Sequence, residues 1–434
     1  MSKDMNINVH HVTRVEGHGN IVVDVKKGEI KKIEWQVPEA PRFFEAMLRG
    51  RHYDELRTIT SRICGICSIG HSLASLKATE DALDVKISEQ SDMLRHLAIN
   101  AENMQSHILH IGYLVAPDLL GVGSVFPLAG SKHQDALLKI VKLHRVSNYM
   151  SDLLCGRTTH PIRLVVGGFS KVPTEKELLT LKEKLIGIVE PTKDVANVIL
   201  SVADKLPDFS RETEYIGLTS KKEYALYDGD IASTDTGIFK DYKNYHKIMQ
   251  EYVVPQSTAK YAKHNRDAYM AGALARFNLN SKQLHPLAKQ IADMFGLKAV
   301  CYNPFMNTIA QLVEFVHNIE DSLMWIDKLV EQGIKNEKPV DVKIKKGRGV
   351  GIVEVPRGIL LHDYTLDEKG NCLKANCIIP TNQNHGNIQK DMEALVPQII
   401  DKSEKEIELI LEMLVRAYDP CISCSTHYLD VNFI

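Results

Sequence analysis

The sequence predicts a mainly α-helical protein with small peripheral β-sheets, an α+β chain whose two ends meet in its interior. Apolar residues recur at every third or fourth position through most of the middle of the chain, which is typical of amphipathic helices. Strand-like stretches are confined to the first forty residues and to a segment after residue 340. Cysteine pairs near both ends indicate that distant parts of the chain converge.

The N-terminal segment is expected to form a β-hairpin, with strands at 20–25 and 29–35 around a Lys-Lys-Gly turn. Helical periodicity follows in five stretches. Pro191 should break the third of them, because proline has no backbone N–H to donate. These stretches are residues 93–115, 135–154, 175–206, 285–294 and 308–330.

A second β-rich stretch is predicted at 340–377, with Gly347, Gly349 and Gly351 at its turns. A long amphipathic helix should then cover 388–417. It is expected to stop before Asp419-Pro420, since proline disfavours helical conformation in the residue before it. No low-complexity linker or internal repeat divides the chain, so residues 1–427 are expected to form one domain.

Composition excludes several classes of protein. Apolar residues make up 44% of the 434 residues and charged residues 25%, which is typical of a soluble globular protein. A formal net charge of −2 predicts no surface for nucleic acid or an anionic membrane. No apolar run approaches the roughly 18 residues of a membrane-spanning helix, and the start resembles no secretory signal. We therefore expect a reducing, cytoplasmic location.

The two cysteine pairs are Cys64 with Cys67 and Cys421 with Cys424. Two thiols three residues apart can reach one metal ion, so the pairs predict a four-thiolate site that only the finished fold assembles. Thiolates favour zinc, copper(I), nickel or iron. Spacing alone leaves two alternatives: a structural zinc, whose pairs usually lie about 15–20 residues apart, and a redox pair, which normally occurs once at a helix start.

The residues around the pairs resemble the two signature motifs of nickel–iron hydrogenase large subunits. These are R-x-C-G-x-C-x-x-x-H at 62–71 and D-P-C-x-x-C-x-x-H at 419–427. Three further segments resemble family elements in the same order: R-V-E-G-H at 14–18, R-F-F-E at 42–45 and E-V-P-R-G at 354–358. Phe43 stands where glycine is usual. The resemblance implies the large-subunit fold, with a central bundle of long helices, and reversible cleavage of dihydrogen.

The resemblance also implies a nickel–iron centre, in which the iron carries one carbon monoxide and two cyanide ligands. By position, Cys64 and Cys421 would be terminal nickel ligands, while Cys67 and Cys424 would bridge the two metals. The segment containing Pro380 and Thr381 resembles the one whose backbone N–H and hydroxyl hold a cyanide ligand.

Three more residues match positions close to the metals, and a fourth departs from the family pattern. Arg357 would place an always-charged guanidinium over the open metal position, with Asp419 as a nearby carboxylate. His71 would hydrogen-bond a bridging sulfur and tune the metal, although a histidine taken alone is equally well explained as structural. Ser106 replaces an aspartate that membrane-linked uptake enzymes often carry, so the sequence looks more like cytoplasmic bidirectional members.

Glu16 matches the carboxylate that exchanges protons beside a terminal cysteine, whereas outside this motif an early glutamate would usually face solvent. Glu45 and His427 match ligands of a second, redox-inactive site, with the backbone carbonyl of Cys377 as a third ligand. Oxygen ligands suit magnesium, and iron is the alternative because histidine is a less typical magnesium ligand.

The resemblance implies partner proteins as well. No cysteine pattern for an iron–sulfur cluster remains, so electrons should leave through an iron–sulfur small subunit. Flavin and iron–sulfur subunits would carry them to NAD(P), ferredoxin, a deazaflavin or a heterodisulfide. A maturation endopeptidase would remove residues 428–434 after nickel insertion. The alternatives are a non-catalytic scaffold related to the quinone-side subunit of respiratory complex I, which lacks the cysteine ligands, and a membrane-bound hydrogen-evolving subunit.

Overall fold

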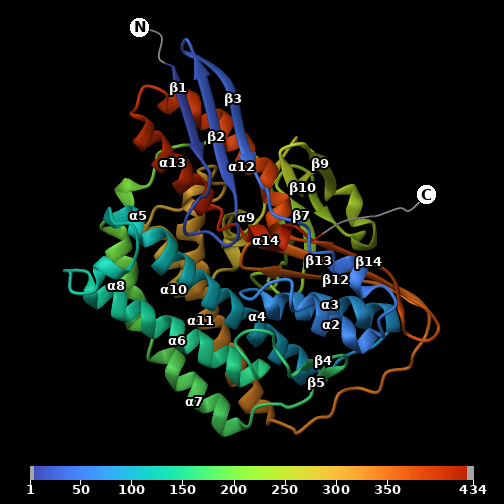
Figure 1. Cartoon of the computed structure of the whole chain (residues 1–434). Coiled ribbons are helices and arrows are strands. Elements are labelled where there is room, and N and C mark those ends of the chain that lie inside the picture. Colours follow the sequence, from blue (N-terminus) through green and yellow to red (C-terminus); the bar gives the residue numbers. More distant parts are fainter. Residues whose placement is uncertain (1–3, 428–434) are drawn as a thin grey trace, which may run out of the picture.

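Long helices form a bundle that occupies the centre and lower left of the view in Figure 1, and small sheets lie above it and to its right. The computed structural model describes residues 4–427. The predicted mainly helical class with peripheral sheets is confirmed. The longer helices of the bundle are α4 Glu89–Leu109, α6 Gln134–Cys155, α7 Glu175–Ile186, α8 Val189–Leu200, α10 Pro286–Met294 and α11 Asn307–Gln332.

Further helices lie around this bundle and near the chain ends. They are α1 Phe44–Leu48, α2 Tyr53–Thr60, α3 Ser68–Leu83, α5 Ala116–Leu120, α9 Ala273–Asn280, α12 Pro380–Ile399, α13 Glu404–Ala417 and α14 Ile422–Ser425. A π-helix, His110–Val115, continues α4, and short 3-10 turns occupy Phe126–Leu128, Ala203–Lys205, Tyr242–Lys247, Ser281–Gln283 and Pro304–Met306. None of the helices within residues 4–427 is both long and apolar enough to cross a membrane.

The predicted N-terminal hairpin is confirmed as β2 and β3, and β1 completes an antiparallel sheet in the order β1-β2-β3. Their bounds are β1 Met5–Val9, β2 Asn20–Lys26 and β3 Glu29–Gln36. A second three-stranded sheet contains β12 Gly347–Val355, β13 Gly358–Leu366 and β14 Cys372–Ile378. A four-stranded sheet, in the order β11-β6-β7-β8, contains β6 Glu214–Thr219, β7 Asp230–Ser233, β8 Gly237–Phe239 and β11 Tyr269–Met270. Two further sheets have two strands each: β4 Leu164–Val165 pairs with β5 Gly168–Phe169, and β9 Gln250–Val254 pairs with β10 Ser257–Lys263.

Two predictions of where a helix is interrupted are wrong. The single helix expected at 388–417 is two helices, because Ser403 caps a new helix in a reciprocal capping box with Glu406. The break expected at Pro191 lies earlier, at Gly187 and Ile188. Pro191 itself sits in the first turn of α8, where a missing N–H costs no intrahelical hydrogen bond.

The three glycines expected at turns lie instead inside β12, where the strand crosses α3. A Cβ atom on Gly347, Gly349 or Gly351 would lie 2.0, 2.1 or 2.0 Å from the carbonyl oxygens of Ala82, Ala78 and Ala74, respectively. Every second strand residue advances about 6.6 Å and every fourth helical residue about 6 Å, so each of the three glycines lies opposite one of the three alanines. The α3 backbone therefore lies directly on the sheet.

Gly349→Ala should destabilise the fold by about 2 kcal/mol or more, because overpacking forces the backbone to move. Its Cβ would meet the carbonyl oxygen of Ala78 and, at 2.2 Å, the backbone nitrogen of Ala82, and neither can rotate away. Denaturant unfolding measures the effect. Gly123→Ala is the matched control, since its Cβ meets nothing within 4 Å. Equal unfolding midpoints for both variants would contradict this account of the glycines.

The N-terminal sheet contacts helices from the C-terminal part of the chain. In Figure 1 the blue sheet β1–β3 adjoins the red helices α12 and α13. Glu16 forms a parallel bridge with Cys421, and its carbonyl oxygen accepts a hydrogen bond of 2.9 Å from the N–H of Ile422. The tail at 428–434 lies outside the described residues, and the single-domain boundary at 427 stays a prediction.

Candidate metal centre

The four predicted cysteines come together in the interior. Their sulfur atoms all lie within 4.8 Å of one another, and all four residues are buried. Cys64 lies between α2 and α3, Cys67 immediately precedes α3, Cys421 precedes α14, and Cys424 lies within α14. Cys421 and Cys424 are joined as a disulfide here, and Cys64 and Cys67 are free thiols. Once that pair is reduced and the thiol protons have left, four thiolates would surround one point, a soft donor set that fits nickel and iron.

The environment of Cys64 favours its thiolate. A hydrogen bond from Cys67 has the largest effect on the pKa of Cys64 and lowers it. Burial raises this pKa, the positive charge of Arg357 lowers it, and the result is a pKa of about 7. The backbone N–H groups of Ile66 and Cys67 point at its sulfur, at 3.3 and 3.2 Å. The pKa of Cys67 is raised well above its usual range, first by its hydrogen bond with Cys64 and then by burial. One thiol of the pair is therefore prepared to bind metal as an anion.

Arg357 and Asp419 form a buried ion pair beside the sulfur atoms. Arg357 Nε donates to the Asp419 carbonyl oxygen at 2.6 Å, and Nη2 donates to Oδ1 at 2.8 Å. Nη1 donates to Ser106 Oγ at 3.3 Å, so Ser106 contacts the guanidinium directly. Burial alone would lower the pKa of Arg357, but Asp419 and the two cysteines raise it. The guanidinium is thus a fixed positive charge held in one orientation.

Asp419 is itself held from a second side. Its backbone is left-handed, with φ of 50°, and Gln311 of α11 donates to its Oδ2 at 3.0 Å. His110, the first residue of the π-helix, lies 3.9 Å from Oδ1 and contacts the Arg416 carbonyl oxygen at 2.7 Å. Single π-helical turns occur often at functional sites, and this one aims His110 at the end of α13.

Glu16 and Thr381 contact the backbone of the C-terminal cysteine segment. Oε2 of the half-buried Glu16 accepts a hydrogen bond of 3.0 Å from the N–H of Ser423, between the two cysteines. Thr381 Oγ1 accepts one of 3.0 Å from the N–H of Cys421, and Pro380 is the first residue of the same helix, α12. The structure thus brings these predicted residues to the sulfur cluster.

Glu45 and His427 form a second buried group. Glu45 Oε1 lies 2.6 Å from His427 Nδ1. That contact lacks the geometry of a hydrogen bond, and the other carboxylate oxygen and the other ring nitrogen have no partner within residues 4–427, although all four atoms are buried. Buried polar atoms normally find partners, so these four atoms fit the ligands of a metal ion. Cys377 lies on β14, against which α1 packs, and burial followed by the charge of Glu45 raises its pKa.

His71 lies one helical turn after Cys67 on α3. Its Nε2 is buried without a hydrogen-bond partner among the described residues, and its Nδ1 lies 3.2 Å from Nε2 of His362. Burial, and after it the neighbouring His362, lowers the pKa of His71 well below its usual range. His71 is therefore a neutral imidazole with one nitrogen free to meet a further group.

Two residues at the centre were missed as functional groups. Arg42 Nη2 donates to the carbonyl oxygens of Ile63 and Ser423, the residues just before Cys64 and Cys424. One guanidinium thus ties the two cysteine segments together. Phe43 beside it has φ of 58°, in the left-handed region that favours glycine, which explains the usual glycine there.

Glu102 of α4 is the second missed residue. Its carboxylate accepts hydrogen bonds from the N–H groups of Ile69, at 2.7 Å, and Gly70, at 3.0 Å, in the first turn of α3. Burial raises the pKa of Glu102 to about 8, although those N–H groups oppose the shift. The helix around it carries several other polar residues, so nothing in the sequence distinguished this glutamate.

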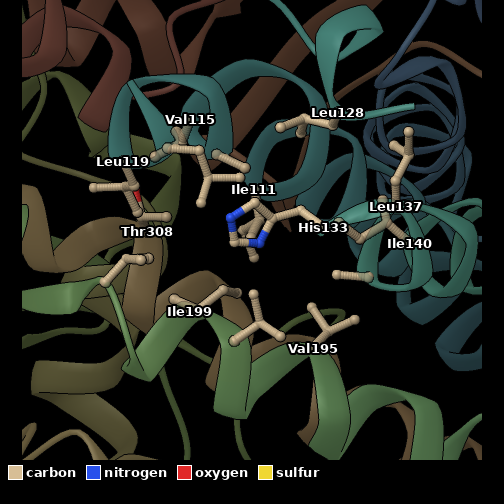
Figure 2. A pocket seen from close by; sticks show the side chains of 15 residues that line it. Ile111, Val115, Leu119, Leu128, His133, Leu137, Ile140, Val195, Ile199 and Thr308 are labelled. Atoms are coloured by element: carbon tan, nitrogen blue, oxygen red, sulfur yellow. The ribbon is translucent and has the colours of Figure 1, made fainter. Parts of the chain in front are cut away.

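An apolar pocket lies beside the π-helix, and Figure 2 shows the His133 ring projecting into it. The cavity measures about 40 Å³. Its walls offer water few partners, so a small apolar molecule fits it better. The lining includes Ile111, Val115, Leu119, Leu128, Leu137, Ile140, Val195, Ile199 and Thr308.

Comparison with protein families gives two matches. Residues 42–136 and 219–427 match the family described as nickel-dependent hydrogenase, and residues 6–40 match one described as HoxL-like. The vhc F420-non-reducing hydrogenase of Methanococcus voltae contains one chain that is 32% identical over 97% of this chain and 94% of its own length. The alpha subunit of sulfhydrogenase 1 of Pyrococcus furiosus is 32% identical over 97% of both chains.

Solved structures agree in fold. An NAD+-reducing [NiFe]-hydrogenase in its H2-reduced state superposes with a TM-score of 0.87 and 26% identity, over 98% of this chain and 99% of that one. The Ni-Fe-Se hydrogenase of D. vulgaris Hildenborough gives a TM-score of 0.80 at 22% identity, over 98% and 100% of the two chains. The second match concerns the fold alone.

Proposed function

This chain belongs to the nickel-dependent hydrogenase family as a large subunit that acts on dihydrogen, and we propose from that premise how its residues divide the work and where its electrons go. The observation that carries the proposal is the buried group of four cysteine sulfurs beside the Arg357–Asp419 ion pair. A non-catalytic scaffold would have no need of four convergent cysteines.

Cys64 and Cys421 would hold nickel as terminal ligands, and Cys67 and Cys424 would bridge nickel to an iron carrying one carbon monoxide and two cyanide ligands. When bound, this centre supplies an electron-rich open position for the heterolytic cleavage of dihydrogen. Thr381, whose hydroxyl already meets the backbone of Cys421, and Pro380 would hold a cyanide ligand.

The remaining residues would handle charge and protons. Arg357 presents a fixed positive charge, oriented by Asp419, to the reacting molecule. Glu16 receives the proton from the cysteine segment that its side chain and backbone both contact, and passes it outward. His71 offers its unpartnered Nε2 to a bridging sulfur.

A second metal ion, magnesium or iron, would bind Glu45 and His427 near the C-terminus. The unpartnered oxygens of Glu45 and nitrogens of His427 support this proposal. The backbone carbonyl of Cys377 would be the third protein ligand. Such an ion would join α1 to the segment after α14, next to the cysteines.

Electrons would leave through an iron–sulfur small subunit; the relatives are named as single subunits of larger enzymes, which supports a multisubunit assembly. From there we propose flavin and iron–sulfur subunits that reduce an NAD(P)-, ferredoxin-, deazaflavin- or heterodisulfide-type acceptor; one solved relative is an NAD+-reducing enzyme. We also propose a cytoplasmic location, on the sequence resemblance to bidirectional members, and removal of residues 428–434 by a maturation endopeptidase.

Infrared spectroscopy of the native complex tests this function. We expect one carbonyl and two cyanide bands, in a window where protein does not absorb, from the purified assembly of this chain with its small subunit. Mature protein with nickel bound but no such bands would contradict the proposal. Mass spectrometry of the same sample should find His427 as the last residue, which checks that the protein measured is mature.

A further inference from the structure

The turn that carries Arg357 joins β12 to β13, and the two strands remain paired as far as Val355 and Gly358. Hairpin turns usually lie at the surface, where water can hydrogen-bond their carbonyl groups. This turn is buried from Val355 through Gly358. Its carbonyl oxygens therefore need donors from the protein, because an unpaired buried polar group is unfavourable.

Arg276 of α9 supplies two of those donors. Its Nη1 donates to the carbonyl oxygen of Val355 at 2.8 Å, and its Nη2 donates to that of Pro356 at 3.1 Å. From α12, Asn384 Nδ2 donates to the carbonyl oxygen of Arg357 at 3.3 Å. Two side chains from other elements thus hold three consecutive carbonyl groups of the turn.

Two carboxylates hold the Arg276 guanidinium itself. Nε and Nη2 donate to the two oxygens of Glu314 at 2.7 and 2.6 Å, and Nη1 donates to Glu354 Oε2 at 2.9 Å. With the two carbonyl oxygens, all five N–H groups of this arginine have an acceptor. Arg276 is fully buried, and although burial would lower its pKa, the charges of Glu314 and Glu354 raise it. The guanidinium is therefore a cation held in one orientation.

The same contacts close a ring around Arg357. Glu314 Oε2 also lies 2.7 Å from His107 Nε2, and Ser106, the residue before His107 on α4, accepts from Arg357 Nη1. The ring runs from Arg276 through Glu314 and α4 to the Arg357 side chain, and it returns to Arg276 through the backbone of the turn. All five side chains are buried. A displacement of Arg276 should therefore reach Arg357 by both paths.

We propose that Arg276 is a positioning residue that fixes the turn at 355–357 and so holds the Arg357 guanidinium in its place beside the four cysteine sulfurs. Arg276 need not touch dihydrogen or the metals to affect the reaction. Its effect on the reaction rests on the proposed function, whereas the placement of the turn is a property of the protein chain alone.

Arg276→Lys tests the proposal in the purified complex of this chain with its small subunit. Lysine keeps the positive charge but has three N–H groups on one nitrogen, which cannot serve two carboxylates and two carbonyl oxygens at once. The kcat for dihydrogen uptake should fall by about 10²-fold, the cost of a 1 Å misplacement in an active site. The KM for dihydrogen and the nickel content should stay unchanged, because Arg357 acts on the reacting molecule after it has bound.

Arg95→Lys is the matched control. Arg95 is also fully buried, and its Nη1 and Nη2 donate to one carboxylate, that of Glu80, at 2.7 and 2.6 Å. Its other hydrogen-bond partners in the described part of the chain are the Tyr227 hydroxyl and the Val165 carbonyl oxygen, so none lies in the turn. This variant should lose stability and keep the wild-type kcat. An equal loss of kcat in both variants would assign the effect to general destabilisation and overturn the proposal.

A double-variant cycle with Arg357→Lys shows whether Arg276 acts through Arg357. If it does, adding Arg276→Lys to Arg357→Lys should lower kcat no further, because both changes remove the same interaction. Losses that multiply would mean that Arg276 acts elsewhere. If Arg276→Lys does not assemble, Glu314→Gln takes its place: an amide N–H then faces one of the arginine donors, so the same loss of kcat is expected.

Crystal structures of the variant complexes give a measurement that does not depend on activity. The Arg357 guanidinium should be displaced from Asp419 in Arg276→Lys, or in Glu314→Gln, and should keep its wild-type position in Arg95→Lys. An undisplaced guanidinium would overturn the proposal whatever the activity. Full activity of Arg357→Lys, together with a displaced guanidinium in Arg276→Lys, would count against the proposed function of Arg357 and would still support the positioning of the turn.

Discussion

Cys64→Ser should abolish dihydrogen uptake and stable nickel binding together. A serine hydroxyl has nearly the same size but is a hard, protonated oxygen, and the three remaining sulfurs cannot complete the site. We expect nickel content and activity both to fall by more than about a hundredfold, the upper range for loss of even an outer partner of a metal ligand. Elemental analysis and a hydrogen-uptake assay on the purified complex measure the two quantities.

The matched control is Cys155→Ser, which places the same hydroxyl at another fully buried cysteine, outside the four-sulfur group. Burial raises the pKa of the Cys155 thiol, and Cys155 does not belong to the group of four convergent sulfurs. This variant should lose some stability and keep its nickel. Full activity and nickel in Cys64→Ser would show that the cysteine ligands are wrongly assigned.

The sequence was sufficient for the helices whose apolar face repeats without interruption, such as α4, α6 and α11. It failed where one residue has two plausible roles. A glycine in a β-rich stretch predicts a turn, yet Gly347, Gly349 and Gly351 exist because a helix backbone lies against them. Only the packing of β12 on α3 makes that visible. Strands β6 to β11 were missed for a related reason, since most are short and packed among other elements.

The same limit applies to the metal centre. The predicted ligands carry their own signal in cysteine spacing and motif context. Arg42 and Glu102 act through backbone groups, and these partners lie in other segments of the chain. No local pattern marks an arginine that joins Ile63 to Ser423, or a glutamate that accepts from the first turn of another helix. Residues that support a site are therefore recognised only once the fold is known.

Glu16→Gln should leave the metals in place and slow the exchange of protons with dihydrogen by about 10²- to 10⁴-fold, the contribution of a positioned acid–base group. The amide keeps an oxygen that can accept the 3.0 Å hydrogen bond from the N–H of Ser423, so the cysteine segment should not move. It has no titratable proton, however. Exchange between deuterium gas and water, followed by mass spectrometry, measures the effect, and infrared spectroscopy checks that the centre is intact.

Glu39→Gln is the control that separates a proton path from a general effect of charge. Glu39 is also a half-buried carboxylate at Ser423, but its Oε1 accepts from the serine hydroxyl at 3.1 Å and from the N–H of His18 at 2.6 Å, whereas Glu16 accepts from the N–H of Ser423. Both variants remove one negative charge that lies beside Ser423. Of the two residues, only Glu16 also pairs its backbone with Cys421. Only Glu16→Gln should slow exchange. Equal slowing in both would assign the effect to lost charge, and unchanged exchange in Glu16→Gln would remove this residue from the path.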